Sequence, residues 1–260
     1  METPLTPLDF ARRAARLYPA REAVVDGATR LTYAQFFEHC ARWSSVLQSL
    51  GVTAGDRVAY IAPNGLPQLA SFYAVPQLAA VLVPINFRLS AGEFAYILNH
   101  SGATVACVHA DYLDMVDGIR AELQTVRHFI AIGTATAAGA APASRGGWTD
   151  YDQMLAAATP TVAAAEIRES DLLSINYTSG TTSRPKGVMI THRNAWMNSV
   201  GSLLHLPMTC ADRYLWTLPM FHANGWTFTY TVTAVGGTHI CLPKVDPRIV
   251  FDLIARERAT

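Results

Sequence analysis

The stretch Tyr177-Thr178-Ser179-Gly180-Thr181-Thr182-Ser183-Arg184-Pro185-Lys186-Gly187-Val188 follows one apolar run, residues 172–177, and leads into another, residues 188–190. This pattern predicts a strand, a tight polar loop and a second strand. The loop combines five Ser and Thr hydroxyls, two glycines and one lysine. Glycines let backbone N–H groups approach a bulky anion, hydroxyls donate hydrogen bonds, and the lysine adds positive charge. Such a loop suits a polyphosphate.

A second interpretation of the same loop is an ordinary turn, because short clusters of Ser, Thr, Gly and Pro usually mark turns. The loop also differs from the common P-loop, in which Gly-Lys is followed by Ser or Thr. Here Lys186 is followed by Gly187. Loop chemistry alone therefore leaves phosphate binding and a plain turn both open.

The order of residues is more specific than their chemistry. The stretch resembles the signature loop of the adenylate-forming superfamily, whose usual form is Tyr-Thr-Ser-Gly-Thr-Thr-Gly-x-Pro-Lys-Gly-Val. It departs at Ser183, where glycine is usual; a positive φ there would strain a serine by about 1 kcal/mol. In that family the loop holds the β- and γ-phosphates of ATP. The resemblance implies this role for Thr178, Ser179, Gly180, Thr181, Thr182 and Lys186.

A second stretch, Pro219-Met220-Phe221-His222-Ala223-Asn224-Gly225-Trp226, follows a predicted strand over residues 214–218. Taken alone, a histidine and a tryptophan beside apolar residues are typical of a core. The stretch also resembles acyl-CoA synthetases, in which the histidine lies near the reacting carboxylate and the aromatic residue lines the acyl pocket. The resemblance implies catalytic roles for Lys186 and His222 and substrate contacts for His222, Asn224, Gly225 and Trp226.

Predicted strands alternate with helical patterns along the rest of the chain. Alternation of this kind predicts parallel βαβ units, and hence an α/β fold with doubly wound, largely parallel sheets and flanking helices. The predicted strands cover residues 57–62, 81–84, 104–108, 128–132 and 239–242, and a hairpin is predicted around Asp26-Gly27. Residues 133–147 are rich in Ala, Gly and Pro, which predicts a surface loop.

Capping signals divide the helices. Thr32 precedes a predicted helix over 33–50, Ser90 and Glu93 form a capping box, and Thr191 precedes a helix over 192–204. Helical patterns also run to about residue 80, over 112–123 and over 148–158. Asn86 and Arg88 are interpreted as loop and cap residues. A last helix begins at Pro247 and is predicted to continue through residues 258–260, because no stop signal follows.

Composition excludes several classes of protein. The 260 residues carry a formal net charge of +0, which argues against nucleic acid or an anionic membrane as the main partner. No apolar stretch has membrane-spanning length, and no secretory signal is visible. The four cysteines are scattered, which favours reduced thiols in a cytoplasmic protein over a disulfide framework or a metal site.

The resemblance covers nearly the whole chain and implies ATP-dependent activation of a carboxylic acid to an acyl-adenylate and then to acyl-CoA. ATP and coenzyme A would be co-substrates, and Mg²⁺ is expected with ATP although no protein ligand is identified. Residues 1–260 would form the amino-terminal part of one truncated AMP-binding domain. The family's later segments and mobile carboxy-terminal domain have no match, so the chain alone is expected to be inactive. A non-catalytic binding remnant and one half of a split enzyme, completed by a second chain, remain alternatives.

Overall fold

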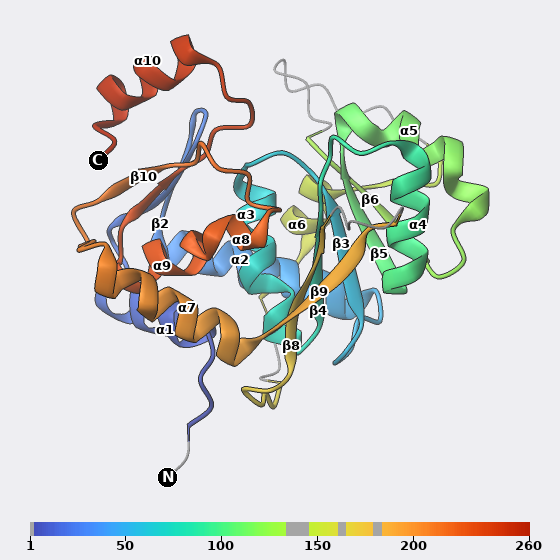
Figure 1. Ribbon diagram of the computed structural model, residues 1–260, viewed down its shortest axis with the longest axis horizontal. Coiled ribbons are helices and arrows are strands. Elements are labelled where there is room, and N and C mark those ends of the chain that lie inside the picture. The colour runs from blue at the N-terminus through green and yellow to red at the C-terminus, as the bar shows by residue number, and fades with distance from the viewer. Residues whose placement is uncertain (1–2, 134–145, 161–164, 179–183) are drawn as a thin grey trace.

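The computed structural model describes residues 3–133, 146–160, 165–178 and 184–260, apart from the side chain of Asn224. Within these residues the strands form two sheets (Figure 1). The larger sheet has seven strands in the order β7-β6-β5-β3-β4-β8-β9. All neighbours in it are parallel except the β8–β9 hairpin. Its strands are β3 (Arg57–Ile61), β4 (Val81–Ile85), β5 (Ala103–His109), β6 (His128–Ile132), β7 (Thr149–Asp150), β8 (Leu172–Thr178) and β9 (Lys186–Thr191).

The smaller sheet joins the two ends of the chain. Its four strands lie in the order β10-β11-β1-β2, in which only the β1–β2 hairpin is antiparallel. The amino-terminal β1 therefore pairs directly with β11, about two hundred residues later in the chain. The strands are β1 (Glu22–Asp26), β2 (Thr29–Thr32), β10 (Arg213–Leu215) and β11 (Thr238–Ile240).

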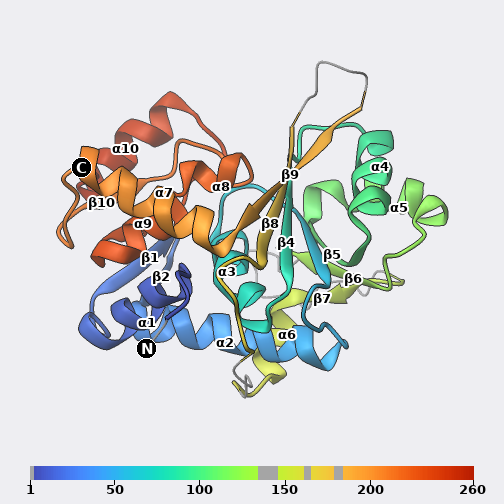
Figure 2. The ribbon, with the colours of Figure 1, turned by 60° about the horizontal axis from the view of Figure 1, so that its bottom comes forward.

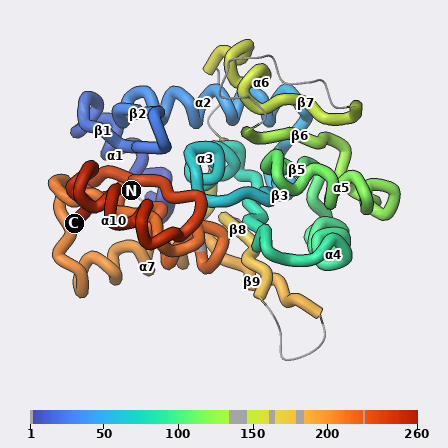
Figure 3. The backbone as a smooth tube through the Cα atoms, turned by 90° about the horizontal axis from the view of Figure 1, so that it is seen from above, coloured from blue at the N-terminus to red at the C-terminus, as the bar shows by residue number. Residues whose placement is uncertain are grey.

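Helices cover both faces of the larger sheet, as the view in Figure 3 shows. Alternate residues along a strand point to opposite faces. Ala59 and Ile61 of β3 pack with α4 and α5, and Val58 and Tyr60 pack with α2, α3 and α6. These helices are α2 (Tyr33–Ser49), α3 (Leu66–Ala74), α4 (Ala91–Ser101), α5 (Leu113–Ile119) and α6 (Tyr151–Ala157). The doubly wound α/β prediction is confirmed.

One hydrophobic cluster fills the space between the two sheets. Its largest fully buried rings include Trp43, Phe72 and Tyr230. Cys40, Cys107 and Cys241 are buried as free thiols, and Cys210 is partly exposed. The remaining helices are α1 (Leu8–Leu17), α7 (His192–His205), α8 (Ala223–Trp226), α9 (Phe228–Val235) and α10 (Pro247–Glu257), with short 3-10 turns η1 (Pro76–Leu78), η2 (Ala110–Tyr112) and η3 (Arg120–Glu122).

The predicted helix starts are confirmed. Thr32, Ser90 and Thr191 each accept a hydrogen bond from the third helical residue in a reciprocal capping box. In the described part of the chain, no helix combines the length and apolar character that a membrane crossing requires.

Four predicted elements have wrong boundaries. The strand predicted over 214–218 ends at Leu215, because the carbonyl oxygens of Trp216 and Leu218 accept hydrogen bonds from Asn64. The last helix stops at Glu257, and Arg258 takes a left-handed φ of 52° as its cap, so it does not run to residue 260. The helices predicted to residue 80 and over 112–123 are shorter and flanked by the 3-10 turns.

Candidate functional site

The polar loop lies at the tip of the β8–β9 hairpin, at the carboxyl ends of the parallel strands. In Figure 2 the paired ends of β8 and β9 that flank this loop lie at one end of the molecule, and α1 and α2 lie at the other. Thr178 and Lys186 face each other as the last pair of the hairpin. Directly opposite residues of an antiparallel pair project from the same face. Thr178 and Lys186 are therefore brought together, whereas Ser179, Gly180, Thr181, Thr182 and the departing Ser183 lie outside the described residues.

Strand β8 joins this tip to the second motif. Asn176 is buried, and its Nδ2 donates a hydrogen bond of 3.0 Å to the carbonyl oxygen of Phe221. The hydroxyl of Ser174 donates to Asn176 Oδ1 at 3.2 Å and orients the amide. Because side chains alternate along a strand, Thr178 shares the face of Asn176. The stretch 219–226 is therefore held on the sheet face that Thr178 shares with Asn176.

Asn64, just beyond β3, fixes the other side of the same stretch. Its Nδ2 donates to the carbonyl oxygens of Trp216 at 3.1 Å and Leu218 at 2.8 Å. Its Oδ1 accepts from the backbone N–H of Met220 at 2.8 Å. Asn64 and Asn176 were not identified from the sequence. The available signal was an amide side chain within or directly after an apolar strand.

A left-handed turn shapes the second motif. Ala223, Gly225, Trp226 and Thr227 all have φ values between 44° and 60°. Such a conformation is unfavourable for residues other than glycine and tends to occur at functional sites. Position 225 requires glycine for a second reason, because a Cβ there would overlap the buried ring of Trp216.

The turn directs its polar and aromatic residues outward. His222 is exposed, and the side chain of Trp226 is 62% exposed. The core interpretation of these two residues is therefore wrong in this structure. Gly225, by contrast, is buried against Trp216, and its place in the site is to shape the backbone.

A buried histidine, His239, packs against Trp216, the ring that contacts Gly225 of the turn. The indole Nε1 of Trp216 donates to Nδ1 of His239 at 3.2 Å, and the rings are stacked. His239 Nε2 lies 3.0 Å from the hydroxyl of Thr233. Burial lowers the pKa of His239 to about 3, so this imidazole stays neutral and acts as a packing and hydrogen-bonding group.

The loop after β4 also contacts the stretch 219–226. Asn86 Oδ1 accepts from the backbone N–H of Arg88 at 3.1 Å, which confirms its predicted role as a loop residue. Phe87 packs edge-on against Phe221, with ring centroids 5.5 Å apart. Strand β8 and the segments following β3 and β4 thus converge on the stretch 219–226, as expected for ligand sites of open α/β sheets.

The described residues offer no cluster of side chains suited to binding a metal ion. In the ranges that the structure describes, no three His, Cys, Asp or Glu side chains are grouped so as to hold a metal ion. We therefore assign no protein ligand to Mg²⁺ and derive no step through it.

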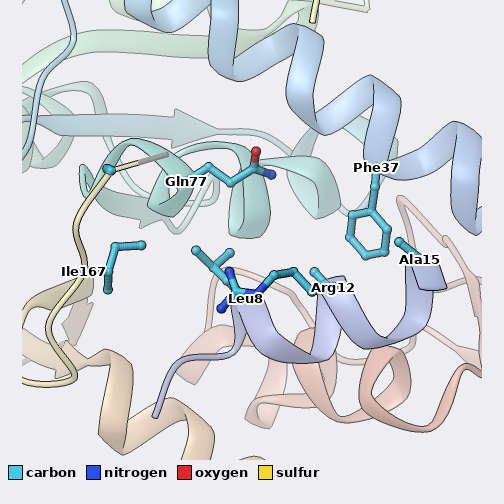
Figure 4. Close-up of a pocket in the computed structure, with 8 residues that line it drawn as sticks. Leu8, Arg12, Ala15, Phe37, Gln77 and Ile167 are labelled. Carbon is cyan, nitrogen blue, oxygen red and sulfur yellow. The ribbon is translucent and has the colours of Figure 1, made fainter. Parts of the chain in front are cut away.

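A separate apolar cavity of about 310 Å³ lies between α1, α2 and the turn at Gln77 (Figure 4). Leu8, Arg12 and Phe37 line it, together with Ile167. It lies by α1, at the end of the molecule opposite the hairpin tip, so it is not part of the site described above.

Comparisons with known proteins agree with this arrangement. A family profile described as "AMP-binding enzyme" matches residues 11–260. A peroxisomal butyrate–CoA ligase of Arabidopsis thaliana is 37% identical over 258 residues, which are 95% of this chain and 45% of that protein. The 4-hydroxybutyrate–CoA ligase 2 of Metallosphaera sedula is 35% identical over 256 residues, 98% of this chain and 47% of that protein. The chain thus spans about half the length of these curated relatives.

Solved structures show the same relationship. The fatty acyl CoA synthetase of Mycobacterium tuberculosis matches with a TM-score of 0.81 and 33% identity, over 98% of this chain and 48% of that one. An anthranilate CoA ligase in complex with anthranoyl-AMP matches with a TM-score of 0.90 over 100% of this chain and 50% of that one. Its 24% identity shows a likeness of fold alone.

Proposed function

Because the chain belongs to the AMP-binding enzyme family, we propose that it forms the amino-terminal part of an enzyme that converts a carboxylic acid to its acyl-CoA. The observation that supports the proposal is that Thr178 and Lys186 pair at the end of the hairpin whose Asn176 holds the stretch 219–226 through Phe221. The matched relatives are CoA ligases, each about twice the length of this chain.

The proposed reaction has two steps. A carboxylate oxygen attacks the α-phosphorus of ATP, the bond to the β-phosphate oxygen breaks, and acyl-adenylate and pyrophosphate form. The thiol sulfur of coenzyme A then attacks the acyl carbon, loses its proton, and AMP leaves. Phosphoryl chemistry of this kind depends on positioning and on neutralising charge.

In this proposal Lys186 neutralises charge on the β- and γ-phosphates, and Thr178 donates a hydroxyl beside it. The residues 179–182 complete the cradle, as the sequence predicts. We expect ATP to bring Mg²⁺, which would screen the same charges.

The acid would bind beside the left-handed turn. His222 and Trp226 are both exposed, which supports the proposal that His222 would lie near the carboxylate and Trp226 would border the acyl group. Asn224 and Gly225 complete the proposed acid-binding turn.

The first experiment uses the two lysines of the chain, Lys186 and Lys244. Pyrophosphate should protect Lys186 from an amine-reactive reagent, and Lys244 should react equally with and without it. Modification is read at each lysine by peptide mass spectrometry. The Lys186→Ala variant should bind pyrophosphate about tenfold more weakly, since a charge-assisted contact contributes roughly 1.5–3 kcal/mol. Lys244→Ala is the matched control.

Equal reaction of both lysines at saturating pyrophosphate would contradict the proposal. Equal weakening by both alanine variants would instead indicate general charge attraction, and would also contradict it.

Two alternatives concern the rest of the enzyme. The chain could be completed by a second polypeptide, or it could bind nucleotide without turnover. Both alternatives keep the phosphate site, so both predict that pyrophosphate protects Lys186. They differ when a second polypeptide with the remaining segments is added, because only the split enzyme would then release AMP. For the compartment we propose a reducing cytoplasm, supported by the four free cysteines; the Arabidopsis relatives above are described as peroxisomal.

A further inference from the structure

Helix α4 lies beside the β8–β9 hairpin, as Figures 2 and 3 show. Tyr96 and His100 are four residues apart on this helix, so their side chains share one face. Their rings are stacked, with centroids 5.1 Å apart and an angle of 29° between the ring planes. The pair presents a flat aromatic surface to the hairpin.

His100 contacts the stem that enters the phosphate loop. Its Nδ1 lies 2.7 Å from the hydroxyl oxygen of Tyr177, the residue directly before Thr178. Burial and the neighbouring Tyr96 raise the pKa of Tyr177 to about 12, so the hydroxyl keeps its proton. It can therefore donate to Nδ1 of His100 in the imidazole tautomer that carries its proton on Nε2.

The Tyr177 ring is also held from the other side. It lies opposite Gly187 of β9, and a Cβ at Gly187 would come within 3.2 Å of Tyr177 Cζ and 2.9 Å of Ile175 Cγ2. The contact with Ile175 is below 3.0 Å and would force a shift, and the contact with Tyr177 would require its ring to move by a few tenths of an ångström, so glycine at 187 lets both side chains pack closely. Tyr177 therefore contacts His100 of α4 on one side and Gly187 of β9 on the other.

Tyr96 contacts the stem that leaves the loop. The guanidinium carbon of Arg184 lies 5.6 Å from the centroid of the Tyr96 ring. A guanidinium at this distance from an aromatic face is attracted by the ring's quadrupole. Residues on both sides of the loop, Tyr177 and Arg184, are therefore held by neighbouring turns of one helix.

We propose that Tyr96 and His100 are positioning residues, which hold the two stems of the β8–β9 loop at the separation that polyphosphate binding requires. This inference rests on the proposed function, because it concerns how the same loop is held. Neither residue needs to touch the anion. Fixing both stems before the anion arrives reduces the ordering that binding must complete, which strengthens binding.

The test measures pyrophosphate affinity of the chain and its variants by calorimetry. His100→Leu removes the acceptor, and Tyr177→Phe removes the hydroxyl. Each should weaken pyrophosphate binding roughly two- to tenfold, the range that one hydrogen bond supplies. The double variant should be no weaker than either single variant, because both remove the same bond.

Conservative variants separate positioning from mere packing. His100→Asn keeps a side-chain acceptor near the Nδ1 position and should restore most of the affinity that His100→Leu loses. Tyr96→Phe keeps the aromatic face under Arg184 and should bind like the unmodified chain, whereas Tyr96→Leu should bind more weakly. Tyr230→Phe is the control, because the described structure gives its buried hydroxyl no hydrogen-bond partner.

Failure of this inference differs from failure of the proposed function. If pyrophosphate binds and Lys186→Ala weakens it, but His100→Leu and Tyr177→Phe do not, the positioning role is wrong. Full additivity of those two variants, or equal losses for His100→Asn and His100→Leu, would also overturn it. If the unmodified chain shows no binding and no protection of Lys186, the proposed function itself fails.

Discussion

At the scale of single residues, Trp226 is the most informative position in the candidate site. It is 62% exposed and has a φ of 56°, so neither burial nor a favourable backbone accounts for an indole there. Trp216, ten residues earlier in the loop after β10, is fully buried. The two tryptophans therefore form a matched pair for separating a binding role from a packing role.

We expect Trp226→Ala to change the free energy of unfolding by no more than about 0.5 kcal/mol, as is usual for surface substitutions. Trp216→Ala should lose roughly 3–5 kcal/mol, because it leaves a cavity in the core. Denaturant titration of both variants measures this contrast. In an enzyme completed by the remaining half, Trp226→Ala should also shift the preferred chain length of the acid.

A large loss of stability for Trp226→Ala, together with an unchanged preference among acids, would place this indole in the packing of the protein. The acid-binding role would then be wrong.

Residue-scale prediction from sequence was uneven for a physical reason. The motif residues could be proposed because their order is local in the chain. Asn64 and Asn176 could not, because their partners are 45 to 156 residues away and hydrogen-bond partners depend on the fold. The outward direction of His222 also depends on a left-handed turn that no local propensity predicts.

At the scale of elements, a charged network joins the smaller sheet to α10. Arg30 of β2 pairs with Glu22 of β1 at 2.9 Å and with Glu257 of α10 at 2.7 Å. Arg213 of β10 also pairs with Glu22, at 2.8 Å. Glu257 has only 3% of its side chain exposed, so its charge depends on these partners.

The network makes stability depend on pH in acid. Burial acts to raise the pKa of Glu22, but hydrogen bonds from Arg30 and Arg213 outweigh it and the pKa lies below the ordinary 4.5. Burial also acts to raise the pKa of Glu257, but hydrogen bonds from Arg30 and Arg256 outweigh it, so this pKa is lowered as well. A lowered folded-state pKa gives stability that is present above about pH 4.5 and is lost as the pH falls through the folded value.

We expect Glu257→Gln to lower the free energy of unfolding at pH 7 by roughly 1.5–3 kcal/mol, the range for hydrogen bonds to charged groups. The variant should also lose stability less steeply between pH 5 and pH 3 than the unmodified chain. Thermal melts across this range measure both effects. Glu38→Gln is the control, since its pair with Arg42 is exposed and spans a single helical turn. An acid profile unchanged by Glu257→Gln would contradict the role of the network.

The type of most elements could be predicted, because hydrophobic period and capping residues act locally. Their ends were harder. The short strand β7 was missed, since two residues carry no periodicity, and it forms only by pairing with β6. Strand β10 ends early because the carbonyl oxygens of Trp216 and Leu218, which follow it, accept hydrogen bonds from Asn64. This is a tertiary contact that the local sequence does not reveal.

At the scale of the whole molecule, the division into two sheets could not be predicted. Alternating strands and helices predict parallel sheets but do not reveal that β1 pairs with β11. That pairing closes a loop of about two hundred residues and depends on the complete topology.

An apolar groove of about 450 Å³ lies beside α10 and β10. Leu206 and Ile254 line it and are 45% and 41% exposed. Phe251 of the same helix is 72% exposed. Contiguous exposed apolar surface of this kind favours association.

We expect the isolated chain to bind the dye anilinonaphthalene sulfonate at this groove and to self-associate at micromolar concentration. Ile254→Glu should reduce dye fluorescence and association, because it places a charge in the groove. Leu17→Glu changes an equally exposed apolar residue on α1 and should have little effect. Dye fluorescence and analytical ultracentrifugation measure the two outcomes. Equal effects of the two substitutions would show that general charge, and not the groove, controls association.

The burial of the cysteines has a consequence for the proposed chemistry. An acyl-adenylate is a mixed anhydride that reacts with any accessible thiolate, including one on the protein that made it. Cys40, Cys107 and Cys241 lie in the interior, and burial raises the pKa of each thiol, that of Cys107 to about 12. A protonated and enclosed thiol is a poor nucleophile. The fold would thus protect these three cysteines from self-acylation in the proposed reaction, and the partly exposed Cys210 is the protein thiol that remains accessible.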